Sequence, residues 1–198
     1  MSRCYLGRVT VPIRQVYTFG EYIDLDADSR VKHEFLDGLV WAMAGGSPEH
    51  AALAAAIVAA LSAGLRGRTC RVFTSDLRIR VRATGLATYP DVTVVCGKLE
   101  VDPSDAKGQT VVNPRVIVEV LSPSTEIYDR GEKLAHYKRI ESLDDIVLIA
   151  HDRRRIEVWH REDGTWSLDV AHGGQSAQLA SIDCALAVDE VYANPLGA

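Results

Sequence analysis

The chain has 198 residues, of which 47% are hydrophobic and 25% charged, a composition typical of a single globular domain. Its formal net charge of −5 argues against indiscriminate binding to phosphate backbones, although it does not exclude a nuclease, because metal-binding carboxylates themselves add negative charge. Neither a membrane-length apolar run of roughly 20 residues nor an apolar leader is present, so we expect a cytoplasmic protein that makes no membrane contact.

The first predicted elements are a short helix, a hairpin and a longer helix. Thr18 and Glu21 have the spacing of a capping box, which predicts a helix that ends near residue 25. Residues 32–43 form two apolar runs around an Asp-Gly pair and predict a β-hairpin. A Ser-Pro pair then opens residues 47–65, where leucine and isoleucine recur every four positions, as in an amphipathic helix.

The middle of the chain is rich in β-branched residues. Residues 70–82 and 88–96 predict strands on either side of a turn near Gly85. Residues 97–114 are polar and predict a loop, and residues 116–121 predict a buried strand.

The last third predicts a helix followed by further strands. Asp129 and Glu132 have capping-box spacing, which predicts a helix over 130–140. A buried strand at 144–150 and a hairpin at 155–170 follow. The order of elements predicts an α/β or α+β fold, with a mixed central β-sheet flanked by helices, an N-terminal helix and hairpin, and a C-terminal β-hairpin extension. We expect one domain over residues 17–198, preceded by an extension of residues 1–16.

Two carboxylates occupy positions where apolar residues are expected. Glu119 lies inside the apolar strand "VIVEVL", and Asp91 opens the strand "DVTVV". A buried carboxylate without a partner costs several kcal/mol. If the two strands are neighbours, their side-chain alternation lets Asp91 and Glu119 converge on one point, where they would form a Mg²⁺ site. The alternatives are a Glu119 that faces solvent at a sheet edge and an Asp91 that serves only the turn.

Six segments carry a family resemblance. They are "KHEFLDGLVWAM", "SPEH", "SDLRIRV", "YPDVTVV", "VEVLSPST" and "YDRGEKLAHY". Together, over residues 17–191, the chain resembles the Uma-type endonucleases of the PD-(D/E)XK superfamily. The resemblance implies a restriction-endonuclease-like fold, a DNA substrate and catalysis by Mg²⁺, with Mn²⁺ as a substitute. It implies that Asp91 and Glu119 bind the metal, and it makes Glu34 a further acidic group of the site.

The sequence departs from the superfamily pattern at one position. The pattern places a lysine two residues after the glutamate, whereas this chain has Leu121. Lys133 is our candidate for the missing cation, because it lies one helical turn from both Asp129 and Tyr137 and shares their face. Lys138 lies farther round the helix and is the weaker choice. A chain that lacks this cation would be a catalytically inactive relative that binds nucleic acid or protein.

Further expectations concern the substrate and the remaining polar residues. Arg78 and Arg80 are predicted to contact DNA phosphates, and Ser122 and Ser124 to line the same cleft. Nuclease folds often dimerise to cut both strands, so a homodimer is compatible with the resemblance.

Simpler interpretations stay open for several residues. Glu34 pairs equally well with Lys32 or Arg30, and Lys133 could be solvated like most helix lysines. His50 is expected to pack or to cap its helix. The four cysteines, at 4, 70, 96 and 184, form no metal-binding pattern and are interpreted as thiols.

Overall fold

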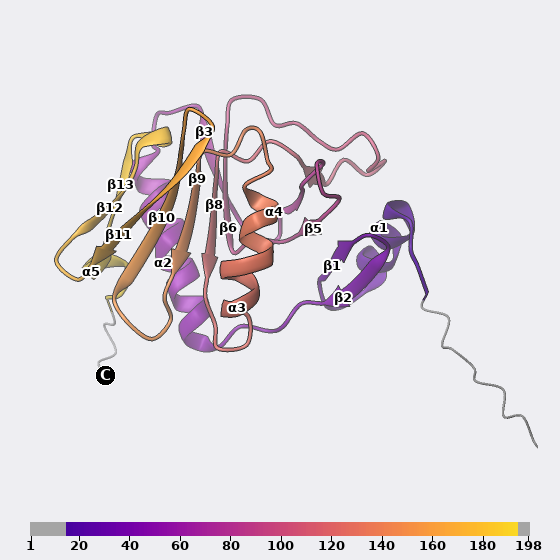
Figure 1. Ribbon diagram of the computed structural model, residues 1–198, viewed down its shortest axis with the longest axis horizontal. Coiled ribbons are helices and arrows are strands. Elements are labelled where there is room, and N and C mark those ends of the chain that lie inside the picture. Colours follow the sequence, from indigo (N-terminus) through magenta and orange to yellow (C-terminus); the bar gives the residue numbers. More distant parts are fainter. Residues whose placement is uncertain (1–14, 194–198) are drawn as a thin grey trace, which may run out of the picture.

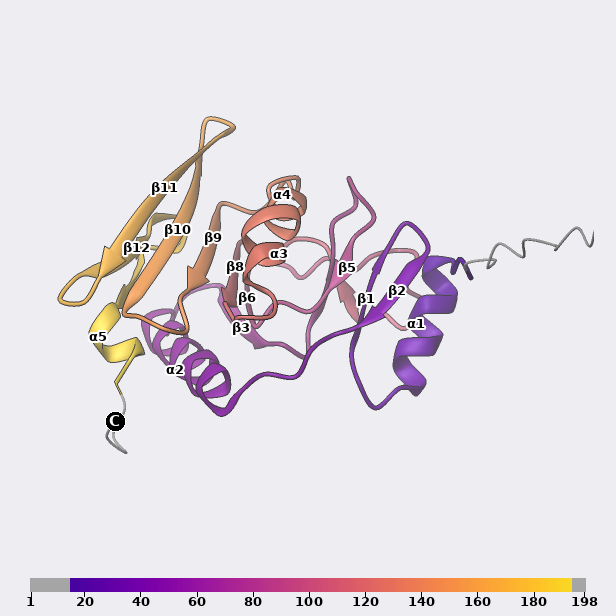
Figure 2. The ribbon, with the colours of Figure 1, turned by 60° about the horizontal axis from the view of Figure 1, so that its bottom comes forward.

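The computed structural model describes residues 15–193 and contains three β-sheets (Figures 1 and 2). Residues 1–14 of the predicted N-terminal extension lie outside the described residues. The central sheet has six strands in the order β11-β10-β9-β8-β6-β3. In chain order its strands are β3 (Cys70–Thr74), β6 (Val92–Cys96), β8 (Val116–Val120), β9 (Asp145–Ile149), β10 (Arg155–Glu162) and β11 (Thr165–His172).

The second sheet has five strands in the order β2-β1-β5-β4-β7. Its strands are β1 (His33–Leu36), β2 (Leu39–Ala42), β4 (Arg78–Arg80), β5 (Ala87–Thr88) and β7 (Thr110–Val111). A two-stranded sheet of β12 (Ser176–Leu179) and β13 (Cys184–Ala187), followed by the short helix α5 (Val188–Val191), completes the C-terminal part. The predicted α+β class with a mixed central sheet is confirmed.

Helices cover both faces of the central sheet (Figure 1). Helix α2 (Pro48–Gly64) buries one stripe of its surface against one face; the residues are Leu53, Ile57 and Leu61. The opposite face is covered by residues 126–137, which we call the crossover helix because it connects the parallel strands β8 and β9. Its Leu134 and Tyr137 pack against Ile117 and Leu148 of those strands.

The crossover helix contains a π-helical turn. It consists of α3 (Glu126–Tyr128), the π-turn η1 (Asp129–Lys133) and α4 (Leu134–Tyr137). The capping box predicted at Asp129 and Glu132 is wrong, because the helix already begins at Glu126, with Thr125 as its N-cap residue. Asp129 therefore lies inside the helix and is buried, and π-turns of this kind are frequent at functional sites.

The predicted N-terminal elements are confirmed. Helix α1 (Phe19–Asp28) begins at the expected capping box, in which Thr18 and Glu21 each accept a hydrogen bond from the other's backbone. The hairpin of β1 and β2 turns at Asp37 and Gly38, whose φ angles of 48° and 81° suit a two-residue hairpin loop. Both strands belong to the five-stranded sheet.

The segment predicted as one strand over 70–82 is divided between two sheets. β3 pairs with β6 in the central sheet, whereas β4 pairs with β5 and β7 in the five-stranded sheet. The break is a turn after Thr74, closed by a hydrogen bond from the Leu77 backbone N–H to the Thr74 carbonyl. Periodicity could not show this break, because both halves are good strand formers.

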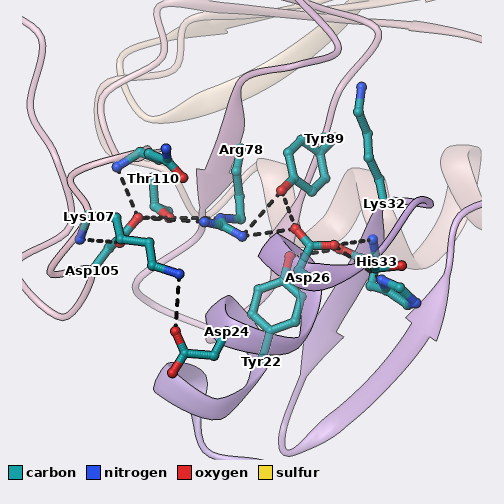
Figure 3. A network of polar contacts seen from close by, with 12 residues as sticks. Tyr22, Asp24, Asp26, Lys32, His33, Arg78, Tyr89, Asp105, Lys107 and Thr110 are labelled. Atoms are coloured by element: carbon teal, nitrogen blue, oxygen red, sulfur yellow. Dashed lines mark hydrogen bonds and ion pairs between the residues drawn. The ribbon is translucent and has the colours of Figure 1, made fainter.

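A buried polar network joins α1 to the five-stranded sheet (Figure 3). The guanidinium of Arg78 on β4 donates to Asp26 of α1 at 3.0 Å and to Thr110 of β7 at 2.9 Å. Tyr89 donates its hydroxyl hydrogen to the same Asp26 carboxylate, and the His33 backbone N–H also donates to it. The network therefore fixes helix α1 and the hairpin, whose strand β1 carries Glu34.

The C-terminal hairpin is confirmed, with β10 and β11 paired along eight residues each. Across residues 15–193, no helix has the length and apolar character needed to cross a membrane.

The cysteine prediction needs a correction. Cys70 and Cys96 are paired across β3 and β6, with Cα atoms 3.9 Å apart, and form a disulfide. Cys184 is a free, half-buried thiol, and Cys4 lies outside the described residues. The spacing of the two bonded cysteines in sequence did not reveal their cross-strand register.

Candidate active site

The two predicted metal ligands belong to neighbouring strand segments: Glu119 lies in β8, and Asp91 immediately precedes β6. β6 and β8 are antiparallel, with Val92 opposite Val118. Continued by one residue, this register places Asp91 opposite Glu119. The Val120 backbone N–H donates to Asp91 Oδ2 at 2.7 Å and orients that carboxylate. Both side chains line a cavity of about 230 Å³, so the predicted convergence of the two strands is confirmed.

Lys133 reaches this cavity from the crossover helix. Its Nζ lies 2.9 Å from Glu119 Oε1, 3.2 Å from Glu34 Oε1 and 3.5 Å from Asp129 Oδ1. The side chain is only 5% exposed. It is therefore not a solvated helix lysine. Leu121 is fully buried in the apolar cluster beneath the helix, so the ammonium group near Glu119 comes from the helix rather than from the strand.

Glu34 enters the cavity from the other sheet. β1 pairs with β5 so that Glu34 lies opposite Thr88, which donates its hydroxyl hydrogen to Glu34 Oε1. The indole N–H of Trp41 donates to Oε2 at 3.0 Å. Lys32, one of the alternative partners, pairs instead with Asp76 at 2.8 Å. The ion-pair partner of Glu34 is thus Lys133.

Burial controls the protonation of these groups. Burial, reinforced by the Asp91 and Asp129 carboxylates, raises the pKa of Glu119 to about 8, although the Lys133 ammonium acts in the opposite direction. Burial likewise raises the pKa of Asp129. The pKa of Lys133 is raised well above its ordinary value, because the attraction of the surrounding carboxylates outweighs its own loss of hydration.

The donor set fits a hydrated divalent cation. Within residues 15–193, four carboxylates line the cavity, from Glu34, Asp91, Glu119 and Asp129, and Lys133 is the one lysine or arginine that lines it. Hydrogen bonds and ion pairs within residues 15–193 occupy Oδ2 of Asp91 and Oε1 of Glu119. One oxygen of each of these two carboxylates is therefore left for a ligand.

The described part of the chain contains no ready-made cage of three or more His, Cys, Asp or Glu side chains. Mg²⁺ does not require one, because it is commonly held by one or two carboxylates and completes its shell with water and substrate phosphate.

His50 is a site residue that sequence reasoning missed. Its Nε2 lies 3.2 Å from Asp91 Oδ2, and hydrogen bonding to Asp91 raises the pKa of the imidazole. The helix is capped by Ser47, which accepts from the His50 backbone N–H, so the ring is free to face the cavity. A Cβ at Gly46 would lie 2.7 Å from His50 Nδ1. Glycine at position 46 leaves room for the His50 ring. This glycine is the one local sequence signal that could have identified His50.

Tyr128 and Tyr137 are further members of the site. The Tyr137 hydroxyl donates to Glu119 Oε1, and this contact follows from the predicted helical face of Asp129, Lys133 and Tyr137. Tyr128 lines the cavity, and its hydroxyl is buried without a hydrogen-bond partner among the described residues. No sequence pattern distinguished Tyr128 from a packing residue.

The predicted nucleic-acid contacts have different outcomes. Ser122 lines the cavity, and its hydroxyl lies 3.1 Å from that of the exposed Ser124. The prediction for Arg78 is wrong: its side chain is only 4% exposed and its guanidinium is bound within the Asp26 network, so it presents no surface to a phosphate. Arg80 is half-buried over the ring of Phe19, pairs with Asp102 and does not line the carboxylate cavity.

Lys138, the weaker candidate, lies away from the carboxylates. Its Nζ is 3.3 Å from the centre of the Trp159 ring, a cation–π contact. Lys133 thus faces the carboxylates and Lys138 does not, as the helical spacing predicts.

Comparisons with known proteins assign the family. Residues 19–189 match the family model described as "Uma2: Putative restriction endonuclease". The chain is 37% identical to "Uncharacterized protein slr1290" of Synechocystis sp., over 87% of this chain and 89% of that protein. It is 29% identical to "Uncharacterized protein sll1609" of the same organism, over 83% and 93% of the two chains.

A solved structure shares the fold. It is described as "a putative nuclease belonging to DUF820" from Anabaena variabilis, with a TM-score of 0.70, 18% identity, and coverage of 89% of this chain and 97% of that one. At this identity the likeness shows the fold alone. The match of the family model to most of the chain shows that this protein belongs to the Uma2 family of restriction-endonuclease-like proteins.

Proposed function

We propose that the protein is a Mg²⁺-dependent endonuclease that hydrolyses phosphodiester bonds of DNA. One observation carries the proposal: Asp91, Glu119 and Lys133 meet in one cavity although they come from three different elements. This set supplies two oxygen ligands and one cation. Metal-assisted phosphodiester hydrolysis uses such ligands to hold the ion and such a cation to stabilise charge on the phosphate.

Each side chain has a distinct task in this mechanism. Asp91 and Glu119 would hold Mg²⁺, which when bound polarises the phosphoryl oxygen and lowers the pKa of coordinated water. The Lys133 ammonium, 2.9 Å from Glu119, would orient the attacking water and balance charge on the phosphate oxygens. Glu34 and Asp129 hold Lys133 in place through its other ion pairs.

Asp91→Asn tests the ligand role. Removing one carboxylate charge while keeping its shape should lower Mg²⁺-dependent cleavage of circular DNA by about 100-fold or more, measured by gel on plasmid and on single-stranded circles. Circular substrates have no ends and so report endonuclease activity. Asp152→Asn, a change at an exposed surface carboxylate, should cleave like the wild type.

Mn²⁺ titration calorimetry separates the alternatives. Weaker Mn²⁺ binding by both Asp91→Asn and Glu119→Gln than by the wild type supports the metal site. Unchanged titrations would overturn it. DNA binding without cleavage by the wild type would identify an inactive, binding-only relative instead.

The proposal includes two further expectations. We expect the protein to act in the cytoplasm, and a homodimer would give twice the monomer mass in light scattering.

A further inference from the structure

A second cavity opens beside the carboxylates. It has a volume of about 760 Å³ and lies between α2, the turn after β3 and the segment 43–46. This segment connects β2 to α2 (Figure 2). We call this cavity the alanine groove. It shares six lining residues with the carboxylate cavity; they are Met43, Ala44, Gly45, Gly46, His50 and Asp91. The groove is therefore continuous with the candidate active site.

Apart from His50, the side chains that α2 contributes to the groove are small and apolar. They are Ala51, Ala54, Ala55, Val58 and Ala59. Small side chains let a flat ligand approach the helix closely and offer it an uncharged surface. A volume of this size accommodates a group as large as a nucleoside, since ligand pockets typically measure about 300–1,000 Å³.

The charges around the groove do not suit a phosphate backbone. Among the described residues that line the groove, Lys32 is the one lysine or arginine. Its ammonium donates to Asp76 at 2.8 Å and to the Ser75 carbonyl at 2.8 Å, so it is already neutralised. A duplex laid along this groove would place two charged strands against an almost uncharged wall, and affinity for duplex DNA rests on phosphate neutralisation.

We infer that the alanine groove binds an unpaired nucleoside next to the scissile phosphate, so that the preferred substrate is single-stranded DNA. This inference rests on the proposed function, because the position of the scissile phosphate follows from the proposed metal site at Asp91 and Glu119. A base in the groove would have to leave a duplex stack. Unpairing and unstacking it lowers the effective affinity for a duplex, whereas a single strand presents it directly.

The first test compares three substrates of the same sequence: a single strand, a perfect duplex and a duplex with an unpaired bubble. With Mg²⁺ or Mn²⁺, the single strand and the bubble should be cleaved at least about tenfold faster than the duplex. Equal rates on all three would overturn the inference and leave the proposed nuclease function standing.

The second test fills the groove. Ala55→Leu places a larger side chain on the exposed groove wall, and Ala59→Leu does so one turn farther along. Ala52→Leu, on the same helix but outside the groove, is the matched control. Alanine and leucine have similar helix propensities, so thermal unfolding should be alike in all three variants.

Binding is read separately from cleavage. Fluorescence anisotropy with a labelled oligothymidylate in Ca²⁺ should show at least about fivefold weaker binding for Ala55→Leu and Ala59→Leu than for Ala52→Leu. If no substrate is cleaved, the proposed function fails, but this binding series still tests whether the groove binds a nucleoside. Equal binding by all variants would overturn the nucleoside site.

Discussion

Glu119 is subject to opposing effects. Burial and two neighbouring carboxylates favour its neutral form, whereas Lys133 and Tyr137 stabilise its charged form. The balance raises its pKa to about 8, above the ordinary 4.5. Between these values the folded protein holds a proton that the unfolded chain has released, so the contribution of Glu119 to stability falls as pH rises through that window.

Metal binding should therefore depend on pH. A cation must displace the proton of Glu119, so Mn²⁺ affinity should rise by up to about tenfold per pH unit from pH 6 and level off near pH 8. Titration calorimetry at pH 6, 7, 8 and 9 measures this dependence. Glu119→Gln should bind more weakly and lose the slope; a slope that persists in this variant would assign the proton to another group.

The crossover helix is the element that completes the site. Its π-turn contains both Asp129 and Lys133, and the two side chains form an i,i+4 ion pair inside the protein. The strand position that usually bears the lysine is used for packing by Leu121. The proposed metal ligand Glu119 thus comes from a strand and the Lys133 ammonium from a helix, so a mutation can remove one without the other.

Lys133→Met tests this separation. Cleavage should fall by about 100-fold or more, whereas Mn²⁺ binding should persist or tighten, because a positive charge beside the ligands is removed. Lys138→Met, on the same helix but stacked on Trp159, should keep wild-type cleavage. Retained activity in Lys133→Met would refute the catalytic role of this lysine.

Two sheets must hold their positions for the site to exist, since Glu34 belongs to one and Glu119 to the other. The buried Asp26–Arg78 pair holds α1, and with it the hairpin that carries Glu34, against β4 (Figure 3). Breaking such a pair leaves an uncompensated buried charge, which is strongly destabilising.

Arg78→Met should lower the free energy of unfolding by about 3–5 kcal/mol, measured by urea denaturation. Arg82→Met provides the comparison, because Arg82 is 55% exposed and lies 4.0 Å from Asp102; exposed ion pairs of this kind contribute at most about 1 kcal/mol. Equal stabilities of the two variants would show that the buried network does not hold the sheets together.

Local patterns predicted much of this molecule, and long-range packing accounts for what they missed. Side-chain alternation predicted that Asp91 and Glu119 would meet if their strands were neighbours, and helical spacing was enough to select Lys133 over Lys138. No pattern connects Arg78 to Asp26, which lies 52 residues earlier. The same holds for His50, whose contact with Asp91 depends on how α2 packs against the sheet.

The origin of Lys133 on the crossover helix makes activity and folding separable. Both proposed metal ligands stay on the central sheet when that helix loosens, but the ammonium group leaves with it. Partial undocking of this helix would then abolish the proposed cleavage, while the cation stayed bound and most of the structure stayed intact. Heat or mild denaturant should accordingly abolish cleavage before spectroscopic unfolding begins.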